Sequence, residues 1–275
     1  MCDKILVTGA KGQLGIELSE ILPDAIFLGK EVFDVSDKNV IEYIRDEKIT
    51  TIVNCAAYTA VDKAEDEPGL AAKVNFEGAS NLAKSGAKII HISTDYVFDG
   101  TNYRPYKTDD KPIPLSVYGQ TKLAGEKSVL GNADIAVIIR TSWLYSFHGN
   151  NFVKTMLKLG QEKKSINVVC DQIGTPTYAK DLAKTIAQIL PQLSAENKGI
   201  YHYTNEGVCS WYDFACEIMS QANLDCEVMP ILSSAYPTKA RRPFYSVLDK
   251  TKIKETFNIK IPHWKKGLQE CLKQF

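Results

Sequence analysis

Tyr118 and Lys122 are the two residues whose chemical types and spacing most clearly suggest a reaction. They lie in SVYGQTKLAGE, residues 116–126, a stretch rich in residues that favour helices. Residues four apart on a helix share one face, so the phenol and the ammonium group can meet there. A phenol titrates at about pH 10 in water, and a neighbouring positive charge lowers its pKa, which prepares it to exchange a proton with a substrate.

The same spacing also arises by chance, since Tyr103 and Lys107 repeat it a few residues earlier. Pro105 lies between them, and proline is unfavourable inside a helix. Only the pair at 118 and 122 has helical surroundings. On spacing alone, an active site and an ordinary helix surface both remain open.

A glycine-rich segment near the start of the chain has the features of a dinucleotide-binding loop. VTGAKGQLG places Gly9, Gly12 and Gly15 directly after an apolar run and before a helical pattern, with Gln13 and Leu14 between the last two glycines. Glycine permits a sharp turn and close approach of a pyrophosphate, and the free N–H groups of a helix start hold its charge. The segment predicts that NADPH or NADH binds here.

The choice between these two cofactors is usually made at the end of the second strand. The segment FLGKEVFDVSD places Lys30 where an acidic residue is expected for NAD, with Glu31 next. Lys30 favours the 2′-phosphate of NADP and Glu31 favours NAD, so the sequence leaves the preference open. Asp34, followed by Val35, is better placed for the adenine edge.

The elements that must position these residues follow a regular alternation in the first half of the chain. Short apolar runs alternate with longer segments of helical pattern, and the runs cover residues 4–9, 25–29, 50–57, 87–94 and 135–143. This alternation is typical of a parallel sheet covered by crossover helices. We predict an α/β fold with a doubly wound parallel sheet (Rossmann) in residues 1–143, with later contributions from about 165–206.

The second half of the chain is less regular. We predict helices at 150–163, 179–190 and 210–222, the last capped by Ser210, and strands at 165–169, 199–205 and 227–231. Residues 144–275 therefore form mainly a smaller substrate-binding lobe. The long proline-containing connections 100–116 and 233–246 are predicted to be binding elements, because long loops in compact α/β proteins often bind ligands.

The composition excludes several classes of protein. The 33 basic and 33 acidic residues cancel, so no general field attracts nucleic acid or a membrane surface. The seven cysteines are odd in number and include no C-x-x-C pair, which favours reduced thiols and a cytoplasmic protein. The N-terminus has the features of a first strand and not of a signal peptide. The four histidines lack metal-ligand spacing, so no metal site is predicted from them.

Several motifs in order resemble the extended short-chain dehydrogenase/reductase family. They are the glycine loop, NCAAYTAVDKAE after the third run, STDYVFDG after the fourth, and YGQTK on the next helix. Together with RTSWLYS, DQIGTPTYAKDLA and RRPFYSVLD, they resemble one branch of that family, the dTDP-4-dehydrorhamnose reductases. The resemblance extends from about residue 4 to about residue 270.

The resemblance implies reduction of the C4 keto group of dTDP-4-dehydro-L-rhamnose to dTDP-L-rhamnose. Tyr118 is then the proton donor, Thr94 gives a second hydrogen bond to the carbonyl oxygen, and Lys122 holds the nicotinamide ribose. The resemblance also implies cofactor contacts for Gly12, Gly15, Asp34, Val35, Ala57, Tyr58 and Thr59, and substrate contacts for Thr94, Asp95 and Trp143. Ala57 and Trp143 also fit simple packing positions.

Three further candidate residues follow from their side-chain chemistry. Arg241 and Arg242 can hold the pyrophosphate of a sugar nucleotide through charge-assisted hydrogen bonds. Adjacent arginines on a loop are as often a solvated pair, so both interpretations stay open. Asn151, in GNNF, can add a hydrogen bond to the same ligand.

Two alternatives share these motifs. Nucleotide-sugar epimerases and dehydratases have the same fold and Tyr/Lys pair, but a 4,6-dehydratase needs an acid where this chain has Tyr96. A cofactor-binding regulatory subunit, resembling that of methionine adenosyltransferase, would keep the fold without turnover. The sequence leaves open the sugar and nucleobase, a homodimer, and a Mg²⁺ ion, for which relatives suggest Glu17 and Glu196.

Overall fold

The apolar runs of the first half form one parallel sheet, as predicted. The computed structural model describes residues 3–275, and its six-stranded sheet has the order β10-β5-β4-β3-β1-β2. All neighbouring strands are parallel. The strands are β1 (Ile5–Thr8), β2 (Ile26–Leu28), β3 (Thr51–Asn54), β4 (Lys88–Thr94), β5 (Ala136–Thr141) and β10 (Gly199–His202).

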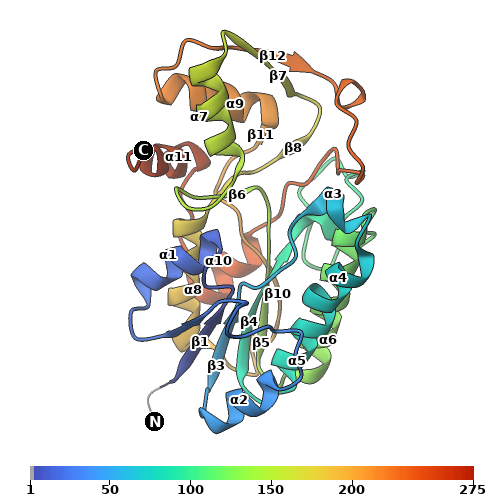
Figure 1. The fold of residues 1–275 in the computed structure, drawn as a ribbon, viewed down its shortest axis with the longest axis vertical. Helices are drawn as coiled ribbons and strands as arrows, with labels where there is room; N and C mark the ends of the chain where they lie inside the picture. Colours follow the sequence, from blue (N-terminus) through green and yellow to red (C-terminus); the bar gives the residue numbers. More distant parts are fainter. Residues whose placement is uncertain (1–2) are drawn as a thin grey trace.

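Alternation along each strand explains why helices cover both faces of this sheet (Figure 1). Val7, Val53 and Ile90 point into one core, which is shared with the helices α1 (Gln13–Ile21), α8 (Ala179–Ile189) and α10 (Thr251–Phe257). Their neighbours Leu6 and Ile52 point into the opposite core, with α2 (Val40–Asp46), α5 (Ala79–Ala83) and α6 (Val117–Asn132). The doubly wound α/β fold is therefore confirmed.

The chain order reverses at β1, which has β2 on one side and β3 on the other. At such a switch point the loops at the carboxyl ends of the strands diverge and leave a crevice where ligands bind. The segments that leave the carboxyl ends of β1, β3, β4 and β5 carry most of the predicted site residues.

The second lobe lies beyond this edge of the sheet (Figure 1). It contains α7 (Phe152–Glu162), β7 (Ser165–Val169), α9 (Trp211–Gln221), β12 (Glu227–Ile231) and α11 (Trp264–Leu272), with β7 parallel to β12. Ser210 caps α9 as predicted, in a capping box with Asp213. Val153, Phe214 and Leu268 are among the residues of its separate core.

The lobes differ from the predicted division in two places. β7, from the range 165–206, belongs to the second lobe, whereas α10, from the C-terminal half, packs on the sheet. An amphipathic pattern shows that a helix is covered on one face but does not show by which neighbour.

Short elements complete the chain. They are α3 (Val61–Ala64), α4 (Pro68–Ala72), the π-helical segment η1 (Lys73–Gly78), the 3₁₀ turns η2 (Asp95–Val97), η3 (Leu190–Gln192) and η4 (Ser233–Ala235), and the strands β6 (Leu144–Tyr145), β8 (Ile173–Gly174), β9 (Thr177–Tyr178) and β11 (Cys209–Ser210). Within residues 3–275, no helix combines the length and apolarity needed to cross a membrane. The six cysteines of this range are free.

Candidate active site

A cavity of about 660 Å³ lies at the carboxyl edge of the sheet. It brings together most of the residues predicted from the sequence: Gly9, Gly12, Gln13, Leu14, Gly15, Lys30, Asp34, Val35, Ala57, Thr59, Thr94, Asp95, Tyr118, Lys122 and Trp143. Four predicted residues, Tyr58, Asn151, Arg241 and Arg242, do not line it.

Tyr118 is positioned by the first turn of α6. The Ser116 hydroxyl caps this turn by accepting a hydrogen bond from the Gly119 N–H at 3.1 Å. Gly119 is required here because a Cβ at this residue would lie 2.2 Å from the carbonyl oxygen of Tyr96. Because glycine has no Cβ, α6 can pack closely against the turn that follows Thr94. This packing places Tyr118 beside that threonine.

The surroundings of Tyr118 contradict one expectation. We expected Lys122 to lower the pKa of the phenol, but burial raises it above its ordinary value, and Asp95 and Tyr96 raise it further. A hydrogen bond with the Thr94 side chain opposes this shift. The expectation was wrong because burial penalises the phenolate more than the hydrogen bond with Thr94 stabilises it. The phenol is thus held in its protonated form.

Lys122 lies on the same face of α6 and is almost completely buried. Its ammonium group donates a hydrogen bond of 2.6 Å to the carbonyl oxygen of Ile92. Burial lowers the pKa of Lys122 to about 8, while the charge of Glu126 opposes this shift. Near neutral pH the group is therefore still largely charged but close to its titration range.

A buried ion pair supports this helix from the sheet side. Arg140 on β5 makes two hydrogen bonds to Glu126, at 2.9 and 2.7 Å, and both side chains are 1% exposed. Ser93 donates a third bond to the same carboxylate at 2.5 Å. This cluster was not predicted from the sequence, because Glu126 on a helix resembles an ordinary surface residue.

Thr94 and Asp95 follow at the end of β4. The Thr94 hydroxyl donates to the Asp95 carboxylate at 3.1 Å and accepts from the N–H of Tyr96 at 3.2 Å. Burial raises the pKa of Asp95 to about 6, against the opposing hydrogen bonds of Ser246 and Thr94. Ser246, from the second long loop, was not predicted as a site residue.

The glycine loop has the shape that a pyrophosphate requires. Gly9 has a φ of +68°, and a Cβ there would lie 2.7 Å from the N atom of Ala56. A Cβ on Gly15 would lie 2.4 Å from the Gly9 carbonyl oxygen. Gly12 is the N-cap residue of α1 and has no side chain that could accept hydrogen bonds from the first N–H groups of the helix. These N–H groups can therefore bind a phosphate. The residues present fit a dinucleotide.

Backbone contacts fix the segment that carries Ala57, Tyr58 and Thr59. Asn75, in the π-helical segment, accepts a hydrogen bond from the Tyr58 N–H at 2.9 Å and donates to the Thr121 hydroxyl at 3.1 Å. The Tyr58 hydroxyl instead donates to Glu67 outside the cavity. Asn75 ties the segment to α6 and was missed, since an asparagine inside a helical pattern gives no distinctive signal.

Opposite charges meet at the adenosine end of the cavity. Lys11 forms an ion pair with Glu31 at 2.9 Å, and both side chains are largely exposed. Lys30 lines the same end. Asp34 accepts two hydrogen bonds from Ser36, which hold the pKa of its carboxyl below the usual value despite partial burial.

Trp143 lies where the two lobes meet. Its backbone has a φ of +49°, a strained conformation for a bulky residue, and such strain is concentrated at functional sites. The indole stacks on Trp211 with ring centroids 3.6 Å apart. A Cβ at Gly174 would lie 2.7 Å from this indole, so the glycine leaves room for it.

The remaining predicted residues lie outside the main cavity. Arg241 and Arg242 line a smaller hollow of about 360 Å³ in the second lobe, together with Tyr236, Phe244 and other residues of the loop 232–246. Asn151 caps α7 and donates a hydrogen bond of 2.9 Å to Gln13. Its side chain is thus occupied in joining the second lobe to the glycine loop.

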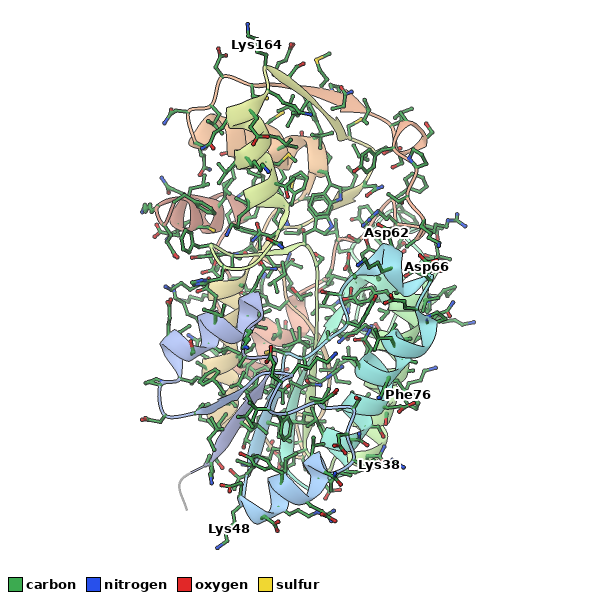
Figure 2. The ribbon with its side chains drawn as sticks, in the orientation of Figure 1. Lys38, Lys48, Asp62, Asp66, Phe76 and Lys164 are labelled. Atoms are coloured by element: carbon green, nitrogen blue, oxygen red, sulfur yellow. The ribbon has the colours of Figure 1, made fainter. Side chains whose placement is uncertain are left out.

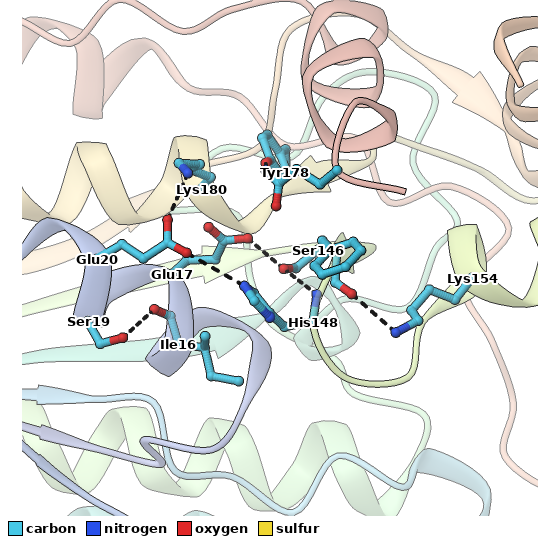
Figure 3. Close-up of polar contacts among 11 residues, drawn as sticks. Ile16, Glu17, Ser19, Glu20, Ser146, His148, Lys154, Tyr178 and Lys180 are labelled. Atoms are coloured by element: carbon cyan, nitrogen blue, oxygen red, sulfur yellow. Dashed lines mark hydrogen bonds and ion pairs between the residues drawn. The ribbon is translucent and has the colours of Figure 1, made fainter.

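One group of potential metal ligands lies between α1, the start of α8 and the segment that carries Ser146 and His148 (Figure 3). Within residues 3–275, Glu17, Glu20 and His148 form the only such group, and Glu196 is not part of it. Glu17 accepts a hydrogen bond from Ser146 at 2.6 Å, and Glu20 pairs with Lys180 at 2.8 Å. We assign no metal to this group.

Comparison with known proteins identifies the family. A protein-family model described as the RmlD substrate binding domain matches residues 3–275. The spore coat polysaccharide biosynthesis protein SpsK of Bacillus subtilis is 41% identical, over 98% of this chain and 97% of its own length. A dTDP-4-dehydrorhamnose reductase of Aggregatibacter actinomycetemcomitans is also 41% identical, over 97% of each chain.

A solved structure agrees with these sequence relatives. The dTDP-4-dehydrorhamnose reductase of Bacillus anthracis, in complex with NADP, is 38% identical and superposes with a TM-score of 0.95 over 100% of both chains. These comparisons confirm the resemblance found in the motifs, and the chain belongs to the RmlD family of dTDP-4-dehydrorhamnose reductases.

Proposed function

We propose that this protein reduces the C4 keto group of dTDP-4-dehydro-L-rhamnose to dTDP-L-rhamnose, with NADPH as the hydride donor. The observation that carries the proposal is the meeting of Thr94, Tyr118 and Lys122 at the switch-point edge, beside a glycine loop shaped for a dinucleotide. Family membership supports the substrate, and the NADP complex of the Bacillus anthracis relative supports the cofactor.

Each residue has a defined task in this proposal. When bound, NADPH supplies the hydride. The Tyr118 hydroxyl donates a proton to the oxygen that becomes negative, and the Thr94 hydroxyl donates a second hydrogen bond to it. With its pKa raised by burial, the Tyr118 phenol carries its proton at neutral pH and can donate it to this oxygen. Lys122 holds the ribose hydroxyls next to the nicotinamide.

The substrate extends from this edge toward the second lobe. Trp143 forms a wall of the sugar site where the lobes meet. Arg241, at the rim of the smaller hollow, is the candidate for the diphosphate, because its side chain is exposed and can make charge-assisted bonds. At the other end, Lys30 and Lys11 favour the 2′-phosphate of NADPH.

Incubation with dTDP-4-dehydro-L-rhamnose and NADPH tests the activity. We expect one NADPH to be oxidised for each dTDP-L-rhamnose formed, as followed by nicotinamide absorbance and by chromatography of the product. An epimerase or a dehydratase would instead retain one tightly bound nicotinamide through dialysis and oxidise no added NADPH. A protein that binds NADPH but reduces no keto sugar would support the regulatory alternative.

A further inference from the structure

Arg242 and its neighbour Arg241 have different surroundings, although they are adjacent in sequence. Arg241 is exposed. The guanidinium of Arg242 donates one hydrogen bond of 2.8 Å to Asp62 and another of 3.0 Å to the hydroxyl of Tyr96. Two of its nitrogens are therefore occupied by protein acceptors from the first lobe.

These bonds belong to a docking contact between the lobes. The loop 232–246 descends from the second lobe beside α3, the helix that carries Asp62 (Figure 1). Asp62 also accepts a hydrogen bond of 3.0 Å from the Ala240 N–H, and Asp66 pairs with Lys239. Both aspartates lie at the boundary of the lobes (Figure 2). The loop thus contacts the first lobe through Lys239, Ala240 and Arg242.

Tyr96 connects this contact to the catalytic edge. Its ring packs edge to face on Tyr118, with centroids 5.5 Å apart. Its N–H donates to Thr94, and its carbonyl oxygen lies against Gly119. Tyr96 therefore contacts both Tyr118 and Thr94, while its hydroxyl accepts a hydrogen bond from Arg242.

We propose that Arg242 is a positioning residue, which holds the Tyr96 ring against Tyr118 through its bridge to Asp62. The docked loop of the second lobe thereby sets the orientation of the catalytic phenol. This role replaces the diphosphate contact predicted for Arg242 from the sequence, and leaves that contact to Arg241. The inference rests on the proposed role of Tyr118.

Paired arginine variants separate the two roles. In Arg242→Gln we expect kcat to fall about 10- to 100-fold, because a small displacement of a reacting group is enough for such a loss. The KM for the sugar nucleotide and the Kd for dTDP should change by no more than about twofold. In Arg241→Gln we expect the reverse, with KM and the dTDP Kd raised about tenfold or more and kcat nearly unchanged.

Further variants keep the test independent of folding defects. Tyr96→Phe keeps the ring but removes the hydroxyl that Arg242 holds, so its kcat should also fall, and adding Arg242→Gln should cause little further loss. Arg242→Lys should recover part of the lost kcat. The NADPH Kd, measured by fluorescence, should stay unchanged in all of these variants and reports an intact first lobe.

Two results would overturn the inference. One is an Arg242→Gln protein with normal kcat and weakened dTDP binding, which would make Arg242 an anion ligand. The other is full additivity of the Tyr96→Phe and Arg242→Gln losses. An active Tyr118→Phe enzyme would instead remove the proposed role of Tyr118, on which the inference rests, so the two failures can be distinguished.

Discussion

The carboxyl edge of the sheet and the loop 232–246 line two separate hollows and contribute different kinds of residue to them. At the edge, Thr94, Tyr118 and Lys122 are each at most 9% exposed and are positioned by long, regular elements. The loop has almost no regular structure, and Arg241 on it is exposed. We infer that the buried frame holds the groups that react, while the loop recognises and orients the substrate. Changes in the frame should therefore reduce kcat and stability. On the loop, a change at Arg241 should chiefly alter KM, whereas a change at Arg242 should lower kcat through its contact with Tyr96.

The largest effect is expected at the proton donor. Tyr118→Phe removes the hydroxyl and keeps the ring, so we expect kcat to fall by about 10²- to 10⁴-fold, the usual contribution of a positioned acid. Steady-state kinetics with the keto sugar measures this, and an unchanged NADPH Kd serves as the control. A variant with wild-type kcat would show that the frame does not supply the proton.

The buried ion pair behind Lys122 should contribute most to stability. Glu126→Gln leaves Arg140 buried without its counter-charge, and we expect the free energy of unfolding to fall by about 3 kcal/mol or more. The matched control is Glu47→Gln, which breaks an exposed pair with Lys4 of similar length and should cost less than about 1 kcal/mol. Urea unfolding measures both changes, and equal losses would contradict the distinction between frame and surface.

The contrast between frame and loop also explains what could be predicted from the sequence. The glycine loop, Thr94 and the Tyr118–Lys122 pair lie at the ends of strongly patterned elements, so their meeting followed from the topology of parallel sheets. The Arg140–Glu126 pair and Asn75 depend on contacts between elements, which no local pattern reveals. The partners of Arg242 lie 146 and 180 residues away along the chain, so the sequence could offer only its charge.

A smaller loss is expected where α6 meets the turn after β4. Gly119→Ala places a Cβ against the Tyr96 carbonyl, so the two elements must separate at a cost of about 1–3 kcal/mol in unfolding free energy. Activity should fall as well, because Tyr118 is the preceding residue. Gly131→Ala, in the last turn of the same helix with open space around it, should be neutral or slightly stabilising. A neutral Gly119→Ala would contradict the tight contact.

Within one unit of neutral pH, the pH dependence should be the smallest of these effects. As pH rises through the pKa of Lys122, about 8, the ammonium loses its proton and its charge near the ribose site. We therefore expect kcat/KM for NADPH to fall about tenfold for each unit above that pH. The measurement is a kcat/KM profile at constant ionic strength. A profile that stays flat to about pH 10, where an exposed lysine titrates, would contradict the burial of this group.

The central claim is that hydride passes from the nicotinamide to C4 of the sugar in the cavity at the carboxyl edge of the sheet. NADPH deuterated at both C4 positions of its nicotinamide ring tests it, with the product analysed by NMR and mass spectrometry. We predict one deuterium per molecule of dTDP-L-rhamnose, located at C4, and almost no product from the Tyr118→Phe protein. A product without deuterium, or with deuterium elsewhere on the sugar, would contradict the account.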